Sequence, residues 1–211
     1  MSIKEKYSQK LLVEGNDDLH VMVALCEKFA IHENFDIINC NGIENLFAQI
    51  PVRFKQSGIE TIGIIIDADT DLAGRWQTLT QKFHTLGIQL PDTIPSAGYI
   101  SSDDNMLHIG IWIMPNNTLD GMLEDFIAFL VPPTDTLMPI IAEHIDAIEH
   151  KQLNKYKLIH RSKALIHSWL SIQEVPGTPL GLSINKKYLT ADDSTCASFI
   201  DWIKTLYSRQ E

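Results

Sequence analysis

The run IGIII, residues 62–66, constrains the fold of this chain more than any other stretch. Four of its five residues are isoleucine, which favours a strand, and the run has no polar face that could be turned towards water. A strand of this kind lies in the middle of a sheet that is covered on both sides. The segment IETIGIIIDAD, residues 59–69, therefore predicts a central strand of an α/β protein.

Strand and helix patterns alternate through the first ~115 residues, on either side of this run. An alternation of this kind predicts a mainly parallel, Rossmann-like sheet with helices on both faces. We expect further strands at 8–13, 35–42, 97–101 and 107–115, and helices at 19–30, 43–58 with a break at Pro51, and 72–87.

The last third of the chain carries mainly helical patterns. A helix over 118–133 would be entered through Thr118 or Asp120 and ended by Pro132 and Pro133. Further helices are expected at 135–150, 157–170 and 198–207, with an irregular stretch at 177–184. We therefore predict an α/β domain over 1–131 and a helical extension over 132–211 that packs on it.

Composition narrows the classes of function. No stretch reaches the ~18 apolar residues of a membrane span, and the N-terminus lacks the apolar core of a secretory signal, so we expect a cytoplasmic protein without membrane contacts. Cys26, Cys40 and Cys196 are too few and too widely spaced for a disulfide framework or a thiolate metal site. The net charge of −10 argues against attraction of nucleic acid by the whole surface, although a local basic patch could still attract it.

Acidic residues follow the predicted strands at the points where the strands end. Glu14 follows the first strand and Asp67, Asp69 and Asp71 follow the buried one, while Glu124 and Asp125 belong to the helix after the last strand. In a parallel sheet these ends meet at one edge, where ligands usually bind. Each acid also has a structural alternative: Asp17 or Asp18, and Asp69 or Asp71, could serve as loop or helix-cap residues, and Glu124 with Asp125 could complement a helix dipole.

Several carboxylates at one edge repel one another unless a cation neutralises them. Hard oxygen ligands suit Mg²⁺ or Mn²⁺, which also bind the phosphates of substrates. The acidic residues together therefore predict a divalent metal site and phosphate chemistry.

Three of these segments, LLVEGNDD, IIIDADTD and GMLEDF, resemble the signatures of the toprim domain. This α/β unit is shared by topoisomerases, primases, small ribonuclease maturases and OLD-family nucleases, and the resemblance covers roughly residues 8 to 130. Together with RSKALIHSWLSIQEVPGTPLGLSI, it is similar to a small family of bacterial stand-alone toprim proteins.

The resemblance implies roles for individual residues. Glu14 would ligate metal or serve as general acid or base, and Asp67 with Asp69 would be the metal-binding pair. Glu124 would complete a second metal site of the OLD type, with Asp71 and Asp18 as weaker candidates. Two metals about 4 Å apart would activate water and stabilise the leaving oxygen in phosphodiester cleavage.

The chain lacks parts that several toprim proteins carry. It has no strand-passage domain with a tyrosine and no cysteine-based zinc module, so the topoisomerase and primase functions are disfavoured. OLD nucleases usually contain an ATPase domain, but no GxxxxGK[ST] occurs here, so an ATPase would have to be a separate partner.

A basic segment, KYKLIHRSKALIHSW at 155–169, contains no acid. Its functional interpretation is a basic surface beside the metal site that contacts the phosphates of DNA or RNA, with Lys163 or His160 assisting catalysis. Its structural alternative is an ordinary solvated helix. The candidate nucleic-acid-binding residues are Lys157, His160, Arg161 and Lys163.

Three hypotheses for function follow. The first is a Mg²⁺- or Mn²⁺-dependent nuclease that acts on DNA or RNA, in phage defence or nucleic-acid processing. The second is a HAD-like phosphatase with Asp67 as nucleophile, although Asp71 departs from that family's motif and Glu14 would have no task. The third is a toprim module without catalysis, which binds or regulates as the partner of an ATPase.

Overall fold

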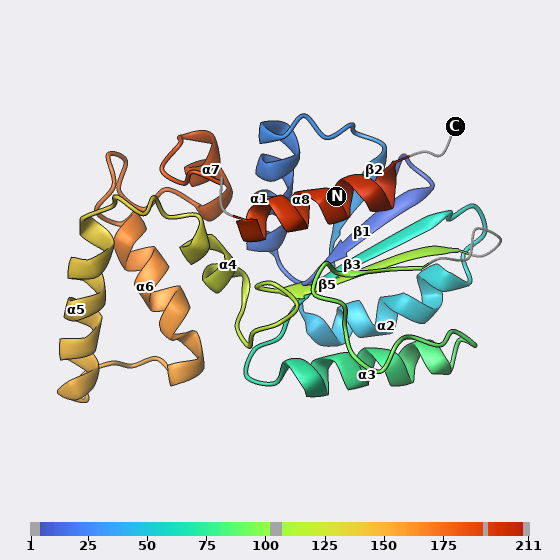
Figure 1. Ribbon diagram of the computed structural model, residues 1–211, viewed down its shortest axis with the longest axis horizontal. Helices are drawn as coiled ribbons and strands as arrows, with labels where there is room; N and C mark the ends of the chain where they lie inside the picture. The colour runs from blue at the N-terminus through green and yellow to red at the C-terminus, as the bar shows by residue number, and fades with distance from the viewer. Residues whose placement is uncertain (1–4, 102–106, 192–193, 209–211) are drawn as a thin grey trace.

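A five-stranded sheet forms the centre of the molecule in a computed structural model that describes residues 5–101, 107–191 and 194–208 (Figure 1). The strand order is β2-β1-β3-β5-β4, and all neighbours pair in parallel except β4, which is antiparallel to β5. The predicted α/β class with a mainly parallel sheet is confirmed. The strands are β1 (Gln9–Val13), β2 (Phe35–Asn39), β3 (Thr61–Asp67), β4 (Tyr99–Ile100) and β5 (His108–Met114).

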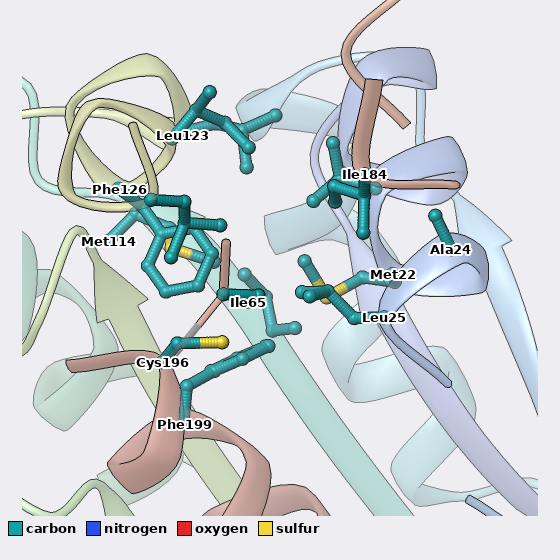
Figure 2. Close-up of a cluster of buried hydrophobic side chains, with 14 of the residues drawn as sticks. Met22, Ala24, Leu25, Ile65, Met114, Leu123, Phe126, Ile184, Cys196 and Phe199 are labelled. Atoms are coloured by element: carbon teal, nitrogen blue, oxygen red, sulfur yellow. The ribbon is translucent and has the colours of Figure 1, made fainter. Parts of the chain in front are cut away.

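Strand β3 lies in the middle of the sheet, as the isoleucine run predicts. Its side chains alternate between two buried clusters: Ile64 and Ile66 pack with α2 (Ile43–Phe54) and α3 (Leu72–His84), and Ile65 packs on the opposite face. That opposite face is covered by α1 (Asn16–Lys28) and α8 (Ser194–Tyr207). Figure 2 shows Ile65 among side chains of α1, β5 and α8.

Helix α8 lies close to the sheet because two neighbouring strand residues have no side chain. Gly63 of β3 pairs with Gly110 of β5, and a Cβ atom at either position would overlap Leu206 or Tyr207 of α8. The hydroxyl of Tyr207 donates a hydrogen bond of 2.8 Å to the carbonyl of Lys10. The last helix of the chain is thus one layer of the α/β core.

The remaining helices lie beyond the carboxyl ends of the strands (Figure 1). Helices α5 and α6 lie side by side, α6 packs on α4, and α7 packs on α1. These elements are α4 (Leu123–Phe129), α5 (Leu137–His150), the 3₁₀ turn η1 (Leu158–His160), α6 (Arg161–Leu170) and α7 (Leu180–Asn185).

Three local predictions were wrong. Helix α2 is not broken at Pro51, because Leu46 and Ile50 anchor it in the core and it tolerates one lost backbone hydrogen bond near its end. Residues 180–185 form a short helix where an irregular stretch was expected. Helix α4 begins at Leu123 instead of near Thr118, since Asp120 accepts the Leu72 N–H and so supports the start of α3.

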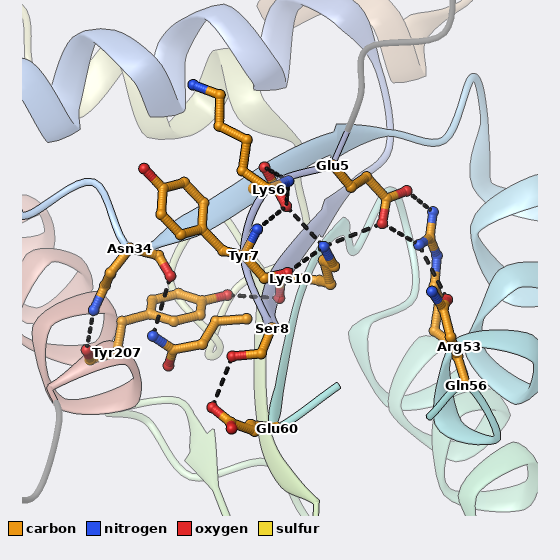
Figure 3. A network of polar contacts seen from close by, with 12 residues as sticks. Glu5, Lys6, Tyr7, Ser8, Lys10, Asn34, Arg53, Gln56, Glu60 and Tyr207 are labelled. Atoms are coloured by element: carbon orange, nitrogen blue, oxygen red, sulfur yellow. Dashed lines mark hydrogen bonds and ion pairs between the residues drawn. The ribbon is translucent and has the colours of Figure 1, made fainter. Parts of the chain in front are cut away.

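A polar network joins the strands near their amino ends (Figure 3). The buried ammonium of Lys10 lies 2.7 Å from Asp36 and 3.1 Å from Glu5, and Arg53 binds the same Glu5 carboxylate at 2.6 Å. These contacts hold residues 5–7 against β2 and α2, and they pair the charges of Glu5, Lys10, Asp36 and Arg53. None of the helices in the described ranges combines the length and hydropathy needed to cross a bilayer.

Candidate metal centre

The carboxyl ends of β1 and β3 bring two of the predicted acids to one edge of the sheet. The strands are neighbours, Glu14 directly follows β1, and Asp67 is the last residue of β3. The carboxylate of Asp67 accepts the Leu123 N–H at 3.0 Å, which fixes the first turn of α4, and with it Glu124, beside the strand end. Burial raises the pKa of Asp67 well above its usual range, and Asp18, Glu14, Glu124 and Asp69 raise it further.

Asp18, predicted as either a helix cap or a weaker metal candidate, also lies at this edge. The residue is 7% exposed, and one carboxylate oxygen accepts the Gly15 N–H at 3.0 Å. The other oxygen, Oδ1, is buried without a hydrogen-bond partner. Burial, followed by the charge of Glu14, raises the pKa of Asp18 to about 7.

Of the two residues predicted as caps of this helix, Asp17 and Asp18, the structure confirms Asp18. Gly15 is the N-cap residue, and Asp18 rather than Asp17 closes the helix end from the third position. The carboxylate of Asp17 is left exposed and does not cap the helix.

Glu14, like Asp18, has a buried carboxylate oxygen and a raised pKa. Its Oε2 atom is buried and has no hydrogen-bond partner. Burial raises the pKa of Glu14, and Asp69 raises it further, while the Asp67 backbone, Arg75 and Lys163 act in the opposite direction. The site therefore contains two buried carboxylate oxygens, on adjacent segments, that the described residues leave without a donor.

Asp69 and Asp71 differ in their contacts. Asp69 has a positive φ of 56°, donates its N–H to the Gly121 carbonyl at 2.8 Å, and forms a 2.5 Å ion pair with Arg75. Asp71 is exposed, and its carboxylate accepts the Gly74 N–H at 2.8 Å as the N-cap of α3. This contact favours the capping alternative for Asp71, whose role as a metal ligand stays a prediction.

Glu124 connects the edge of the sheet to α6. It is 2% exposed, and its Oε1 atom lies 3.1 Å from the ammonium of Lys163. Glu124 also forms a second group with Asp17 and His167, because one ligand atom of each lies within 4.8 Å of the others. Asp17 and His167 were not predicted as members of the site, since nothing in the local sequence indicates that α6 packs beside the start of α1.

The four predicted basic residues do not form one patch: they differ in what their side chains contact. Lys163 faces the acidic site through Glu124, whereas Arg161 forms ion pairs with Asp146 and Glu149 of α5. Lys157, the N-cap of η1, and His160, its last residue, are exposed. Arg161 is therefore engaged in joining α5 to α6, and Lys163 is the one of these four with an ion pair at the acidic site.

The donor set fits a hard divalent cation. Six carboxylates converge from the starts of α1 and α4 and the ends of β1 and β3, and the described cations that pair with them are Lys163 and Arg75. The unpartnered oxygens of Glu14 and Asp18 provide acceptors of the kind that Mg²⁺ and Mn²⁺ require. The six carboxylates belong to Glu14, Asp17, Asp18, Asp67, Asp69 and Glu124.

Fold and site together define an α/β protein with a carboxylate-lined edge at the carboxyl ends of its parallel strands. A family model described as "Protein of unknown function (DUF3226)" matches residues 8–208, and the chain belongs to this family. Among curated proteins and solved structures, no significant match is found.

The family match runs from β1 through α8, across residue 131, so the division into a domain over 1–131 and an extension over 132–211 stays a prediction.

Proposed function

We propose that this protein is a divalent-metal-dependent phosphodiesterase that cleaves nucleic acid. The observation that carries the proposal is the pair of buried, unpartnered carboxylate oxygens, Glu14 Oε2 and Asp18 Oδ1, beside the partly buried carboxylate of Asp67. Buried carboxylates without donors are costly, and a bound cation removes that cost. The resemblance of the same segments to toprim signatures supports phosphate chemistry.

The proposed metal ligands fall into two groups. Glu14, Asp18 and Asp67 would hold one Mg²⁺ or Mn²⁺, with Asp69 free to join after it leaves Arg75. Glu124, Asp17 and His167 offer a second group, with Lys163 beside it. When bound, such ions lower the pKa of a ligated water and offset charge on the phosphate.

The residues of the chain have roles of their own in this proposal. Because the pKa of Asp18 is about 7, this acid holds a proton near neutrality in the metal-free protein and would release it when a cation binds. The Leu123 N–H fixes one oxygen of Asp67, which orients the other. Lys163, half exposed at the site, is the proposed contact to a substrate phosphate.

Exposed Lys157 and His160 would contact the nucleic acid further from the metal. With a net charge of −10, productive binding would depend strongly on these few cations and on salt. DNA and RNA carry the same phosphodiester group, so the site does not distinguish them and each is tested separately as a substrate. A separate ATPase is the proposed protein partner.

The test uses purified full-length protein stripped of metal. Titration calorimetry with Mn²⁺ and Mg²⁺ measures binding, and labelled single- and double-stranded DNA and RNA report cleavage. We expect metal-dependent cleavage that Asp67→Asn and Glu14→Gln reduce at least 100-fold. Glu143→Gln on the exposed surface of α5 is the matched control and keeps full activity.

Other outcomes assign other functions. Metal binding without cleavage of any nucleic acid, with or without an added ATPase, favours the binding or regulatory module. Hydrolysis of a phosphate monoester with a covalent phosphate on Asp67 favours the HAD-like phosphatase. Failure of the protein to bind either metal contradicts the proposal outright.

A further inference from the structure

Strand β2 leaves the edge of the sheet open. It pairs with β1 on one side, and among the described residues no strand pairs with its other side (Figure 1). The N–H of Cys40 donates to the Val13 carbonyl at 3.0 Å, so this peptide group faces β1. Because successive residues alternate, Ile38 also faces β1, whereas the N–H and C=O groups of Phe35, Ile37 and Asn39 point to the open side.

A groove of about 900 Å³ runs along this open edge. Its floor is β2, and one wall is the outer side of α1, including Leu19, Val23 and Cys26. Val23 is 38% exposed although it is apolar, and Ile37 is only partly buried. Helix α1 thus presents apolar side chains beyond the edge of the sheet, over the position that a sixth strand would take.

The opposite edge of the sheet is not open to the same degree. Strand β4 has two residues, and the carbonyl of Tyr99 accepts a hydrogen bond from the Trp202 indole at 3.1 Å. Very short edge strands are a common protection against unwanted pairing. Strand β2 has five residues and shows no such protection on its open side within the described chain.

The charge along the groove indicates the chemistry of its occupant. Four carboxylates and one lysine line it, and two of these carboxylates, Asp36 and Glu5, are neutralised at the floor by Lys10 and Arg53. The exposed Glu27 and Glu33 flank the outer side, with Lys6 lying 3.7 Å from Glu33. A second copy of the chain placed across this edge would bring the outer acids Glu27 and Glu33 of the two copies together, whereas a basic segment would complement them.

We propose that the β2 edge is a docking site for an extended segment of a partner protein, with alternating apolar and basic residues, which adds to the sheet as a sixth strand. Backbone hydrogen bonds to Phe35, Ile37 and Asn39 would give affinity, and apolar side chains on Val23 and Leu19 would give specificity. The site lies on a different edge from the carboxylates and does not depend on the proposed hydrolase activity.

The probe is a fluorescent seven-residue peptide of alternating valine and lysine, measured by fluorescence anisotropy with the full chain. We expect saturable binding, together with slower amide exchange at Phe35 and Ile37. A peptide N-methylated on alternate residues, so that one edge cannot donate, should bind at least tenfold more weakly. Val23→Ser, which removes the apolar contact without adding a charge, should weaken binding at least tenfold, whereas Val52→Ser, at an exposed valine of α2 outside the groove, should not.

A second variant tests the ladder itself. The Ile37 N–H faces the open side, so Ile37→Pro removes an edge donor without removing a bond to β1. It should abolish peptide binding, and Val23→Ser keeps the test decisive if this variant fails to fold. Equal binding of the N-methylated peptide, or no binding of either peptide, overturns the proposal. A dimer in solution that Ile37→Pro dissociates also overturns it, because a second copy would then occupy the edge.

Discussion

The ammonium of Lys163 lies 3.1 Å from the carboxylate of Glu124, and this ion pair joins α6 to the acidic edge of the sheet. Glu124 is buried, whereas the Lys163 side chain is 49% exposed. Burial lowers the pKa of Lys163, but the neighbouring Glu124 outweighs it and the pKa is raised. In the metal-free protein Lys163 is therefore the cation that offsets Glu124.

Lys163→Met should destabilise the metal-free protein and make it more responsive to metal. The substitution leaves the buried Glu124 charge without its partner, which should lower the free energy of unfolding by about 1–2 kcal/mol, discounted for the exposure of Lys163. A divalent ion no longer competes with the ammonium, so Mn²⁺ should raise the melting temperature more than in the wild type. Thermal unfolding with EDTA and with Mn²⁺ measures both effects.

Lys204→Met, at an exposed lysine of α8, is the control for this variant. It removes the same charge from the chain and should change neither stability nor the response to Mn²⁺. Equal behaviour of the two variants would show that Lys163 does not compete with a cation at Glu124.

Asp18→Asn should stabilise the metal-free protein at alkaline pH and have little effect in acid. The folded protein holds the Asp18 proton up to a pKa of about 7, whereas the unfolded chain releases it near 3.8. The stability associated with this carboxyl is therefore present below about pH 4 and is lost as the pH rises to 7. Asparagine keeps the acceptor for Gly15 and remains neutral throughout, so it avoids this loss.

The advantage of Asp18→Asn over the wild type should grow from near zero at about pH 3 to about 2–4 kcal/mol at pH 8. Urea unfolding at several pH values in EDTA measures it, because the difference between the two proteins cancels the titration of other groups. Added Mn²⁺ should narrow the gap at pH 8 by stabilising the wild type. A gap that is independent of pH would mean that Asp18 is ionised in the folded protein.

The acids at the strand ends could be predicted because they depend only on local sequence and parallel pairing. Once 62–66 is a central strand and 8–13 its neighbour, Glu14 and Asp67 must lie at the same edge. Asp17 and His167 could not be predicted, since their proximity depends on how α6 packs on α4. The short helix α7 could not be predicted either. Gly181 allows it to approach the His20 carbonyl, and no local sequence pattern indicates this tertiary contact.

Lys157→Gln and Arg161→Gln should differ in their effects on nucleic-acid binding. Lys157 is exposed and has no ion pair among the described residues, so its loss should weaken DNA or RNA binding and reduce the salt dependence by about one unit of slope. Arg161 already binds Asp146 and Glu149, so its loss should reduce affinity less. It should instead lower stability, by about 1 kcal/mol or less because the pair is partly exposed.

Fluorescence anisotropy with labelled oligonucleotides at several salt concentrations compares the two variants, and urea unfolding gives their stabilities. An Arg161→Gln effect on affinity as large as that of Lys157→Gln would place Arg161 in contact with the nucleic acid, after it leaves the acids of α5.

Gly63→Ala should destabilise the protein, and Tyr207→Phe should reduce that cost. A Cβ atom at Gly63 would overlap the Tyr207 hydroxyl and Leu206, so α8 must move away from the sheet. Overpacking of this kind costs about 1–3 kcal/mol. Phenylalanine at 207 removes the nearest overlapping atom, although it also removes the hydrogen bond to the Lys10 carbonyl and costs about 1 kcal/mol by itself.

A double-mutant cycle with urea unfolding separates these effects. The double variant should be more stable than the sum of the two single changes predicts, by about 0.5–1.5 kcal/mol, because one clash disappears with the hydroxyl. Val52→Ala in place of Gly63→Ala gives the additive control, since this exposed residue of α2 lies on the face of the sheet opposite α8. Strict additivity of Gly63→Ala with Tyr207→Phe would mean that α8 does not rest on the glycine pair. The close approach of the last helix to β3 would then have to depend on Leu206 and Gly110 alone.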